Sequence, residues 1–348
     1  MLHPRDVLLG AQSTTGQLPV CDHYCGVEAR MKKSLQLQAE MSEEFGACVF
    51  DVTLDCEDGA PSGGETEQAH LVVSMAASAH AARPTVRPRV GARVHPVDHH
   101  AFDADVQIIL GQAAAHLSYI MIPKVESVSD VLQAVAAIDA ATSAHVANPI
   151  PLHVLIESAG AVRNAFDIAA HPRVESVSFG LMDFVSSHAG AIGSQAMGVR
   201  AQADTETLDQ FNHPLVVRAK LEVASACHAY GKVPSHCVVT EFRDTMALER
   251  AAKRAAHALG YTRMWSIHPD QIRPILRAFS PAQDEVDLAA RIVEEAARND
   301  WAPTSVDGKL HDRASYRYFW QLLERAHRTG RDLPMSVRQY FSADRQDV

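Results

Sequence analysis

Short apolar runs, rich in β-branched residues, alternate with longer stretches of helical period along most of this chain. Such alternation is typical of β-α-β units, in which helices connect parallel strands. We recognise eight strand-like runs, at Leu18–Tyr24, Ala47–Asp55, Thr85–Val94, Ser118–Val125, Ile150–Ser158, Val174–Asp183, Val233–Phe242 and Thr262–His268. Eight strand–helix repeats are the number that closes a barrel, so the sequence predicts an α/β protein with a (β/α)8 TIM barrel.

Helical period is clearest at Glu65–His80, Ser127–Ala141, Leu215–Tyr230 and Thr245–Leu259. The strand-like runs are nearly continuous and apolar, as expected where both faces of a sheet are buried. A doubly wound open sheet is the alternative fold, but no G-x-G-x-x-G motif follows an early strand.

The 348 residues exceed what one barrel usually needs. We assign residues 1–283 to a catalytic barrel domain and residues 284–348 to an appended helical element. The second part contains AARIVEEAAR, with apolar residues at helical spacing over Asp284–Arg298. We expect this C-terminal extension to act as a lid on the barrel mouth or on a neighbouring subunit.

Charge and composition exclude several classes of protein. The formal net charge of −10 argues against a nucleic-acid-binding protein, which needs a basic face. No apolar run approaches the length of a membrane span, and no signal peptide is recognisable. The six cysteines are scattered and form no C-x-x-C pairs, which favours reduced thiols. We therefore expect a cytoplasmic protein without a membrane partner.

Carboxylates end two neighbouring strands of the predicted barrel. The active sites of such barrels lie at the C-terminal ends of the strands. Glu157 ends the fifth strand and Asp183 the sixth, and two converging carboxylates suit Mg²⁺. Mn²⁺ also accepts oxygen ligands and stays possible. The alternative is that each acidic residue stabilises the start of the following helix.

Three basic or aromatic side chains at strand ends are candidates for substrate binding. Arg93 can bind a carboxylate through two N–H groups, or it can form a salt bridge to Glu57 or Asp58. Lys124 suits an ion pair with a carboxylate better than a Schiff base. His268 ends the last strand, where it helps to shape the mouth or makes a structural hydrogen bond.

Seven motifs resemble the citrate lyase β-subunit and malyl-CoA lyase family, within the wider HpcH/HpaI aldolase group. They run in the family's order over roughly residues 47–313 and read LDCEDGA, RVHP, IMIPKVES, LIESAGAV, FGLMDF, SIHPDQI and VDGK. The resemblance implies that Glu157 and Asp183 are the Mg²⁺ ligands. It also implies that Arg93 holds the substrate's carboxylate or carbonyl oxygens.

The same resemblance gives roles to three further acidic residues. Glu57 and Asp58 match an acidic pair that supports the metal's waters and the arginine. Asp307 of VDGK matches an acid/base that the C-terminal lid delivers into a neighbouring subunit's site. This implies a homo-oligomer, a trimer or a hexamer. The chain departs from the family at His95, where Asn is common, and in its first and seventh strands.

The resemblance thus predicts a Mg²⁺-dependent carbon–carbon lyase. Its substrate would be a 2-hydroxy-acid CoA thioester of the malyl-CoA or citramalyl-CoA kind, cleaved to an acyl-CoA and glyoxylate or pyruvate. One alternative is a pyruvate-type aldolase acting on a free 2-keto-4-hydroxy acid. Others are a thioesterase of the (3S)-malyl-CoA type and a non-catalytic subunit that keeps the barrel.

Overall fold

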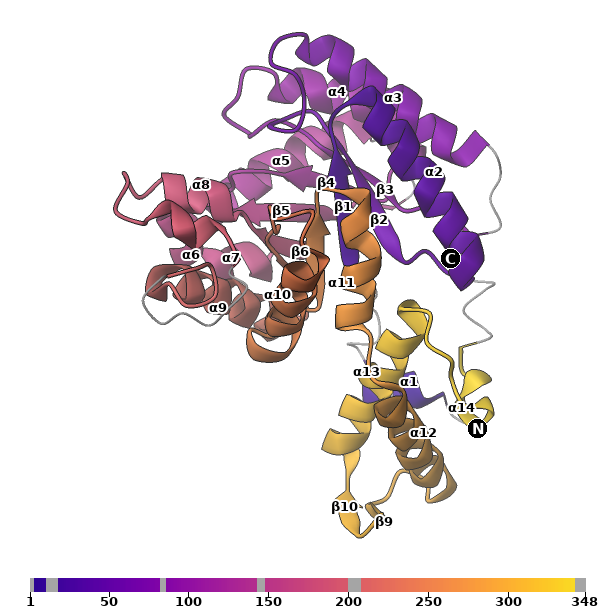
Figure 1. Cartoon of the computed structure of the whole chain (residues 1–348). Helices are drawn as coiled ribbons and strands as arrows, with labels where there is room; N and C mark the ends of the chain where they lie inside the picture. Colours follow the sequence, from indigo (N-terminus) through magenta and orange to yellow (C-terminus); the bar gives the residue numbers. More distant parts are fainter. Residues whose placement is uncertain (1–2, 11–17, 82–85, 143–147, 200–207, 342–348) are drawn as a thin grey trace. The chain divides into compact units, whose positions relative to one another are not determined.

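The computed structural model describes residues 3–10, 18–81, 86–142, 148–199 and 208–341 (Figure 1). The chain divides into two compact units, one of residues 18–278 and one that joins residues 1–17 to residues 279–348. The sequence analysis placed the boundary between residues 283 and 284 and assigned the N-terminal residues to the barrel. The contacts instead group those residues with the C-terminal unit.

Eight parallel strands form a closed barrel in the first unit, in the order in which they follow one another in the chain. Neighbouring strands pair in parallel register all round, and β1 also pairs with β8. The barrel fold predicted from the sequence is therefore confirmed. The strands are β1 Cys21–Cys25, β2 Phe50–Asp55, β3 Val90–Arg93, β4 Tyr119–Ile122, β5 Leu152–Ile156, β6 Val174–Phe179, β7 Val233–His236 and β8 Arg263–Ser266.

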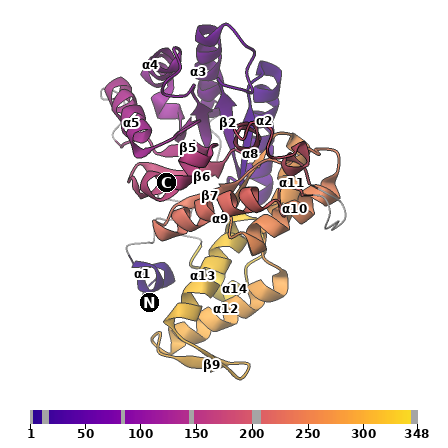
Figure 2. The same cartoon turned by 90° about the vertical axis from the view of Figure 1, so that its left-hand side faces the viewer.

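Helices form a layer outside the strands (Figures 1 and 2). The four stretches of clear helical period correspond to α3, α5, α9 and α10. The helices of this unit are α2 Glu28–Phe45, α3 Glu65–Ala81, α4 Phe102–Ala113, α5 Val128–Thr142, α6 Ala159–Arg163, α7 Ala165–Ala170, α8 Leu181–Ser186, α9 Pro214–Ala229, α10 Thr245–Ala258 and α11 Ile272–Phe279. Short 3-10 turns lie at η2 Ala114–His116, η3 Ser194–Met197 and η4 Pro269–Gln271.

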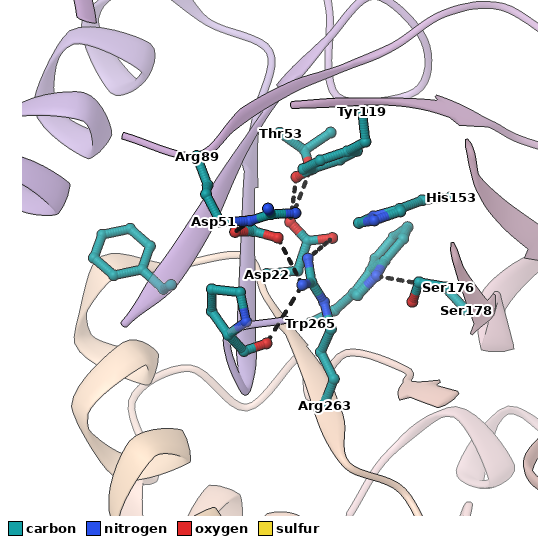
Figure 3. Close-up of polar contacts among 12 residues, drawn as sticks. Asp22, Asp51, Thr53, Arg89, Tyr119, His153, Ser176, Ser178, Arg263 and Trp265 are labelled. Carbon is teal, nitrogen blue, oxygen red and sulfur yellow. Dashed lines mark hydrogen bonds and ion pairs between the residues drawn. The ribbon is translucent and has the colours of Figure 1, made fainter. Parts of the chain in front are cut away.

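A buried network of charged side chains fills the barrel near the N-terminal ends of its strands (Figure 3). The Arg263 guanidinium contacts Asp51 over 2.6 Å and Asp22 over 3.1 Å. Asp22 also accepts hydrogen bonds from Thr53 and Tyr119, over 2.7 and 3.2 Å. Each charge thus meets an opposite charge or a hydrogen-bond donor, as burial of ionised groups requires.

An apolar layer lies further along the strands. It consists of Met121, Leu155 and Trp265, with Tyr24 and Val238 packed against them. The indole N–H of Trp265 donates to Ser178 over 2.9 Å, so the one polar atom of this ring is satisfied. The polar residues at the C-terminal strand ends therefore have an apolar floor.

The second unit is a small helical body with its own core. It contains α1 Pro4–Leu8, α12 Gln283–Arg298, α13 Arg313–Arg328, α14 Met335–Arg338 and a hairpin of β9 Thr304–Val306 and β10 Lys309–His311. Trp320 is fully buried in its core and donates to Glu324, which also binds Arg5. The helix predicted at Asp284–Arg298 is confirmed as α12. In the described part of the chain, no helix has both the length and the apolar content to cross a bilayer.

Candidate active site

Arg93 is held by two carboxylates at the C-terminal end of β3. Its Nε and Nη2 donate to the two oxygens of Asp55 over 2.7 and 2.6 Å. Its Nη1 contacts Glu57 over 2.9 Å, and the guanidinium lies 5.0 Å from the centre of the Tyr24 ring. The side chain is only 4% exposed, so these contacts fix it in one position. The predicted salt bridge to Glu57 is present.

Asp55 was not among the residues predicted for the site. It pairs with Arg93 across β2 and β3, so both side chains leave neighbouring strands at the same height. Its oxygens also accept the backbone N–H groups of Glu57 and Gly59 over 3.0 and 2.8 Å. The signal was the alternation of Asp51, Thr53 and Asp55, which places three polar side chains on one face of a strand.

Lys124 lies against the acidic pair that follows β2. Its Nζ contacts Glu57 Oε1 and lies 3.4 Å from Asp58. Burial opposes the charge of this lysine, yet the contact with Glu57 holds the pKa of Lys124 above its usual value. Lys124 therefore stays charged, as an ion pair requires and a Schiff base does not. Glu57 joins the two cations, since it binds both Arg93 and Lys124.

Glu157 is a buried carboxylate directly after β5, with 6% of its surface exposed. Its Oε2 accepts the backbone N–H of Lys124 over 2.8 Å. Lys124 has a φ of 53°, a conformation that non-glycine residues adopt rarely and that often marks functional sites. Burial and the neighbouring charge of Asp183 raise the pKa of Glu157 to about 8.

Gly180 leaves the space that the Glu157 side chain occupies. A Cβ atom at Gly180 would lie 2.4 Å from both Cγ and Oε1 of Glu157. The glycine follows β6 and precedes the first turn of α8, which carries Asp183. The sequence FGLMD thus supplies one carboxylate and makes room for the other.

The carboxylates of this cluster outnumber its cations. Asp55, Glu57, Asp58, Glu157 and Asp183 are acidic, against Arg93 and Lys124. Within the described residues, no group of three or more His, Cys, Asp or Glu side chains could enclose a metal ion. Mg²⁺ needs no such cage, because it keeps waters or substrate oxygens as ligands. Glu157 and Asp183 are neighbouring carboxylates whose like charges repel, and two oxygen ligands of this kind fit Mg²⁺.

Two further predicted site residues have partners of their own. His268 accepts the backbone N–H of Asp270 over 3.2 Å and stacks on Phe242, which matches the structural hydrogen bond considered for it. Asp307 belongs to the second unit and binds Arg291 on α12 over 2.8 and 3.1 Å. Its carboxylate is exposed, and Arg291 lowers the pKa of Asp307.

Asp307 also has a structural role that its motif did not reveal. With Gly308 it forms the two-residue turn between β9 and β10, at φ values of 51° and 75°. Positive φ at both positions is the signature of the Asp-Gly hairpin turn. VDGK is therefore a turn sequence as well as a family motif.

Residues 35–269 match the family model described as HpcH/HpaI aldolase/citrate lyase. A solved citrate lyase from Burkholderia xenovorans LB400 is 46% identical, with a TM-score of 0.80 over 98% of this chain and 100% of that one. An L-malyl-CoA/β-methylmalyl-CoA lyase of Cereibacter sphaeroides (strain ATCC 17029) is 28% identical over 287 residues, which are 79% of this chain and 87% of the relative. CitE of Mycobacterium tuberculosis was solved with magnesium, acetoacetate and coenzyme A. It is 20% identical to this chain, with a TM-score of 0.62 over 89% of this chain and 98% of CitE, and it has the same fold.

Proposed function

Because the chain belongs to the HpcH/HpaI aldolase/citrate lyase family, we propose that it is a metal-dependent carbon–carbon lyase acting on a 2-hydroxy-acid CoA thioester. The malyl-CoA lyase among its relatives and the coenzyme A bound to CitE support a thioester of the malyl-CoA or citramalyl-CoA kind. The proposal rests on one observation at the C-terminal ends of the strands. A fixed arginine, Arg93, lies there near two acidic residues suited to Mg²⁺, Glu157 and Asp183.

Arg93 is suited to hold a carboxylate or carbonyl of the substrate. A guanidinium has five N–H groups, and the contacts with Asp55 and Glu57 use three of them. One N–H on each Nη nitrogen is left for the substrate, which is the arrangement that a two-pronged contact needs. Because Arg93 is already fixed, little side-chain freedom is lost when substrate binds.

Glu157 and Asp183 would hold the metal, and the magnesium bound to CitE supports Mg²⁺ as the ion. A bound Mg²⁺ supplies Lewis-acid stabilisation of negative charge on substrate oxygens. The Lys124 N–H and the absent side chain of Gly180 keep Glu157 in place. Glu57 couples Arg93 and Lys124, so the cations of the site keep a constant spacing. Mn²⁺ is the second candidate ion, because the ligands are all oxygens.

Cleavage also needs a group that takes the proton of the substrate's hydroxyl and gives it to the carbon of the acyl fragment once the carbon–carbon bond has broken. We assign this role to Asp307, on the family resemblance of VDGK. Its exposed position on a hairpin tip suits a group that enters another subunit's site, and its partner Arg291 would have to release it. This assignment requires a homo-oligomer, for which a trimer or hexamer is our expectation.

A cleavage assay tests the proposal. Chelator-treated protein is incubated with malyl-CoA, citramalyl-CoA or 4-hydroxy-2-oxo acids, without metal or with Mg²⁺ or Mn²⁺. Released glyoxylate or pyruvate reports carbon–carbon cleavage, and free CoA thiol reports thioester hydrolysis. We expect metal-dependent release of the oxo acid from a thioester, and its loss in Glu157→Ala. Glu43→Ala, the same change on the outer helix α2, is the matched control.

The other outcomes assign the chain differently. Release from the free keto acids alone would make it an aldolase, and free thiol without glyoxylate or pyruvate would make it a thioesterase. No turnover of any substrate, in protein that still binds Mg²⁺, would support a non-catalytic subunit. Equal activity in Glu157→Ala and Glu43→Ala would refute the metal site.

A further inference from the structure

His95 lies at the same rim of the barrel as Arg93, two residues further along the chain. The backbone continues extended between them, since the N–H of Val94 donates to the carbonyl of Met121 over 3.2 Å. Side chains two residues apart on an extended segment share one side and start about 7 Å apart. His95 is therefore a neighbour of the guanidinium that we assign to substrate binding.

Asp105 on α4 fixes the orientation of the His95 ring. Its Oδ2 accepts the backbone N–H of His95 over 3.0 Å and contacts Nδ1 over 2.6 Å. Asp105 is only 1% exposed, so water does not compete for this carboxylate. An ionised carboxylate only accepts hydrogen bonds, hence Nδ1 carries a proton whether the ring is charged or neutral. No hydrogen bond from the described residues reaches Nε2.

The charged and titratable groups around this ring come from several elements. They are Asp105 on α4, Glu57 after β2, Glu65 at the start of α3, and His99 and His100 in the loop before α4. The hydrogen bond from Asp105 raises the pKa of His95 above its usual value, burial acts against it, and Glu57 and Glu65 add to the rise. Nε2 therefore carries a proton further into the neutral range than in an ordinary histidine.

The other basic groups of the rim are already engaged. Arg93 binds Asp55 and Glu57, and Lys124 binds Glu57 and Asp58. Among the described residues, the hydrogen-bond partner of the His95 ring is Asp105, which takes Nδ1 and leaves the opposite edge of the ring for a ligand. That edge presents a donor when the ring is charged and a lone pair when it is neutral.

We propose that His95 is a substrate-positioning residue whose Nε2–H donates to an oxygen of the substrate's free carboxylate, beside Arg93. This inference rests on the proposed function, since it concerns the same substrate site. Asn is common here in the family that the sequence resembles, and its amide also donates. An amide keeps its proton at every physiological pH, whereas His95 loses it as pH rises.

The test compares His95→Asn, His95→Ala and Asp105→Asn with the wild type between pH 6 and 9. His116→Asn, a histidine change on η2, is the matched control. Two readouts are measured in Mg²⁺: the KM and kcat for thioester cleavage, and the dissociation constant of malonate, a plain dicarboxylate, by calorimetry. At pH 6 we expect His95→Ala to weaken malonate binding and raise KM about tenfold to hundredfold, as for loss of a charged hydrogen bond.

The pH profile separates positioning from mere support of the loop. In the wild type KM should rise as the imidazole loses its proton, with kcat nearly constant. The rise should move to lower pH in Asp105→Asn, because the group that raises the pKa is removed, and should vanish in His95→Asn. If the pH dependence of KM is the same in His95→Ala and Asp105→Asn as in the wild type, the proposal is wrong. It is also wrong if kcat, KM and melting temperature all change together in these variants. Malonate binding that depends on His95 in a protein that cleaves no thioester would refute the proposed function alone.

Discussion

Replacing Gly180 by alanine should remove metal-dependent activity while leaving the barrel folded. The new Cβ would lie 2.4 Å from Cγ and Oε1 of Glu157, where ordinary contact begins at 3.4 Å. The carboxylate must therefore withdraw by about 1 Å, because the Glu157 side chain moves more easily than backbone. The backbone at Gly180, with φ −90° and ψ 93°, lies close to the extended region and accepts alanine.

The size of the effect follows from this displacement. A misplacement of about 1 Å in a catalytic constellation costs on the order of 100-fold in rate. That is about 2.7 kcal/mol, since each tenfold in rate corresponds to about 1.4 kcal/mol. We expect kcat/KM to fall by about this factor and Mg²⁺ affinity, measured by calorimetry, to fall with it. The melting temperature should change by only a few degrees.

Gly111 provides the matched control for this experiment. It lies on the exposed side of α4, and a Cβ there meets no atom within 4 Å. Alanine in a helix interior is favoured over glycine by about 0.5–1 kcal/mol, so Gly111→Ala should raise stability and keep full activity. If Gly180→Ala binds Mg²⁺ and turns over substrate as Gly111→Ala does, Glu157 is not the ligand that we assign.

Three further outcomes are expected. The pKa of Glu157 in the metal-free protein is about 8, so Mg²⁺ must displace a proton when it binds at neutral pH. The affinity of the protein for Mg²⁺ should therefore rise about tenfold per pH unit from pH 6 to 7.5. Calorimetry that detects no proton release at pH 7 would contradict this. Arg93→Lys keeps the charge but loses the paired contact with Asp55, so KM should rise at least about tenfold and stability should fall; an unchanged KM would refute the role of the guanidinium. Arg263→Met removes the cation between two buried aspartates, so the free energy of unfolding, measured in urea, should fall by about 3–5 kcal/mol. A fall below about 1 kcal/mol would mean that water reaches this network.

The strands could be predicted because their two buried faces leave a simple apolar pattern, but their ends could not. The seventh strand was predicted over Val233–Phe242, and β7 ends at His236. Valines continue after it, yet the carbonyl of Val239 accepts from the side chain of Gln271 over 2.7 Å instead of from a strand. A side-chain contact 32 residues away is not visible in local composition.

A residue of the candidate site could be predicted from the sequence where it ends a strand. It was harder to predict where its role depends on the register in which two strands pair. Glu157, Arg93 and Lys124 were proposed as site residues from their positions alone, and all three follow or end strands of the barrel. Asp55 was missed, because its partnership with Arg93 follows from how β2 and β3 align. The position of Asp307 in a hairpin turn was equally hidden, since an Asp-Gly pair serves a turn and a family motif alike.

The layers within the barrel explain why a site with so many charges is compatible with a stable fold. Near the start of the strands, Arg263 and Arg89 form compact ion pairs with Asp22 and Asp51. The layer of Met121, Leu155 and Trp265 then separates these pairs from the rim. Opposite charges in close contact produce little net field at a distance, whereas the rim carries an excess of carboxylates. Burial raises the pKa of Glu157, the neighbouring carboxylate of Asp183 adds to the rise, and a bound divalent cation would relieve the repulsion between them. The rim thus gives up some electrostatic stability in the metal-free protein, and recovering that stability would favour the metal binding that we propose there.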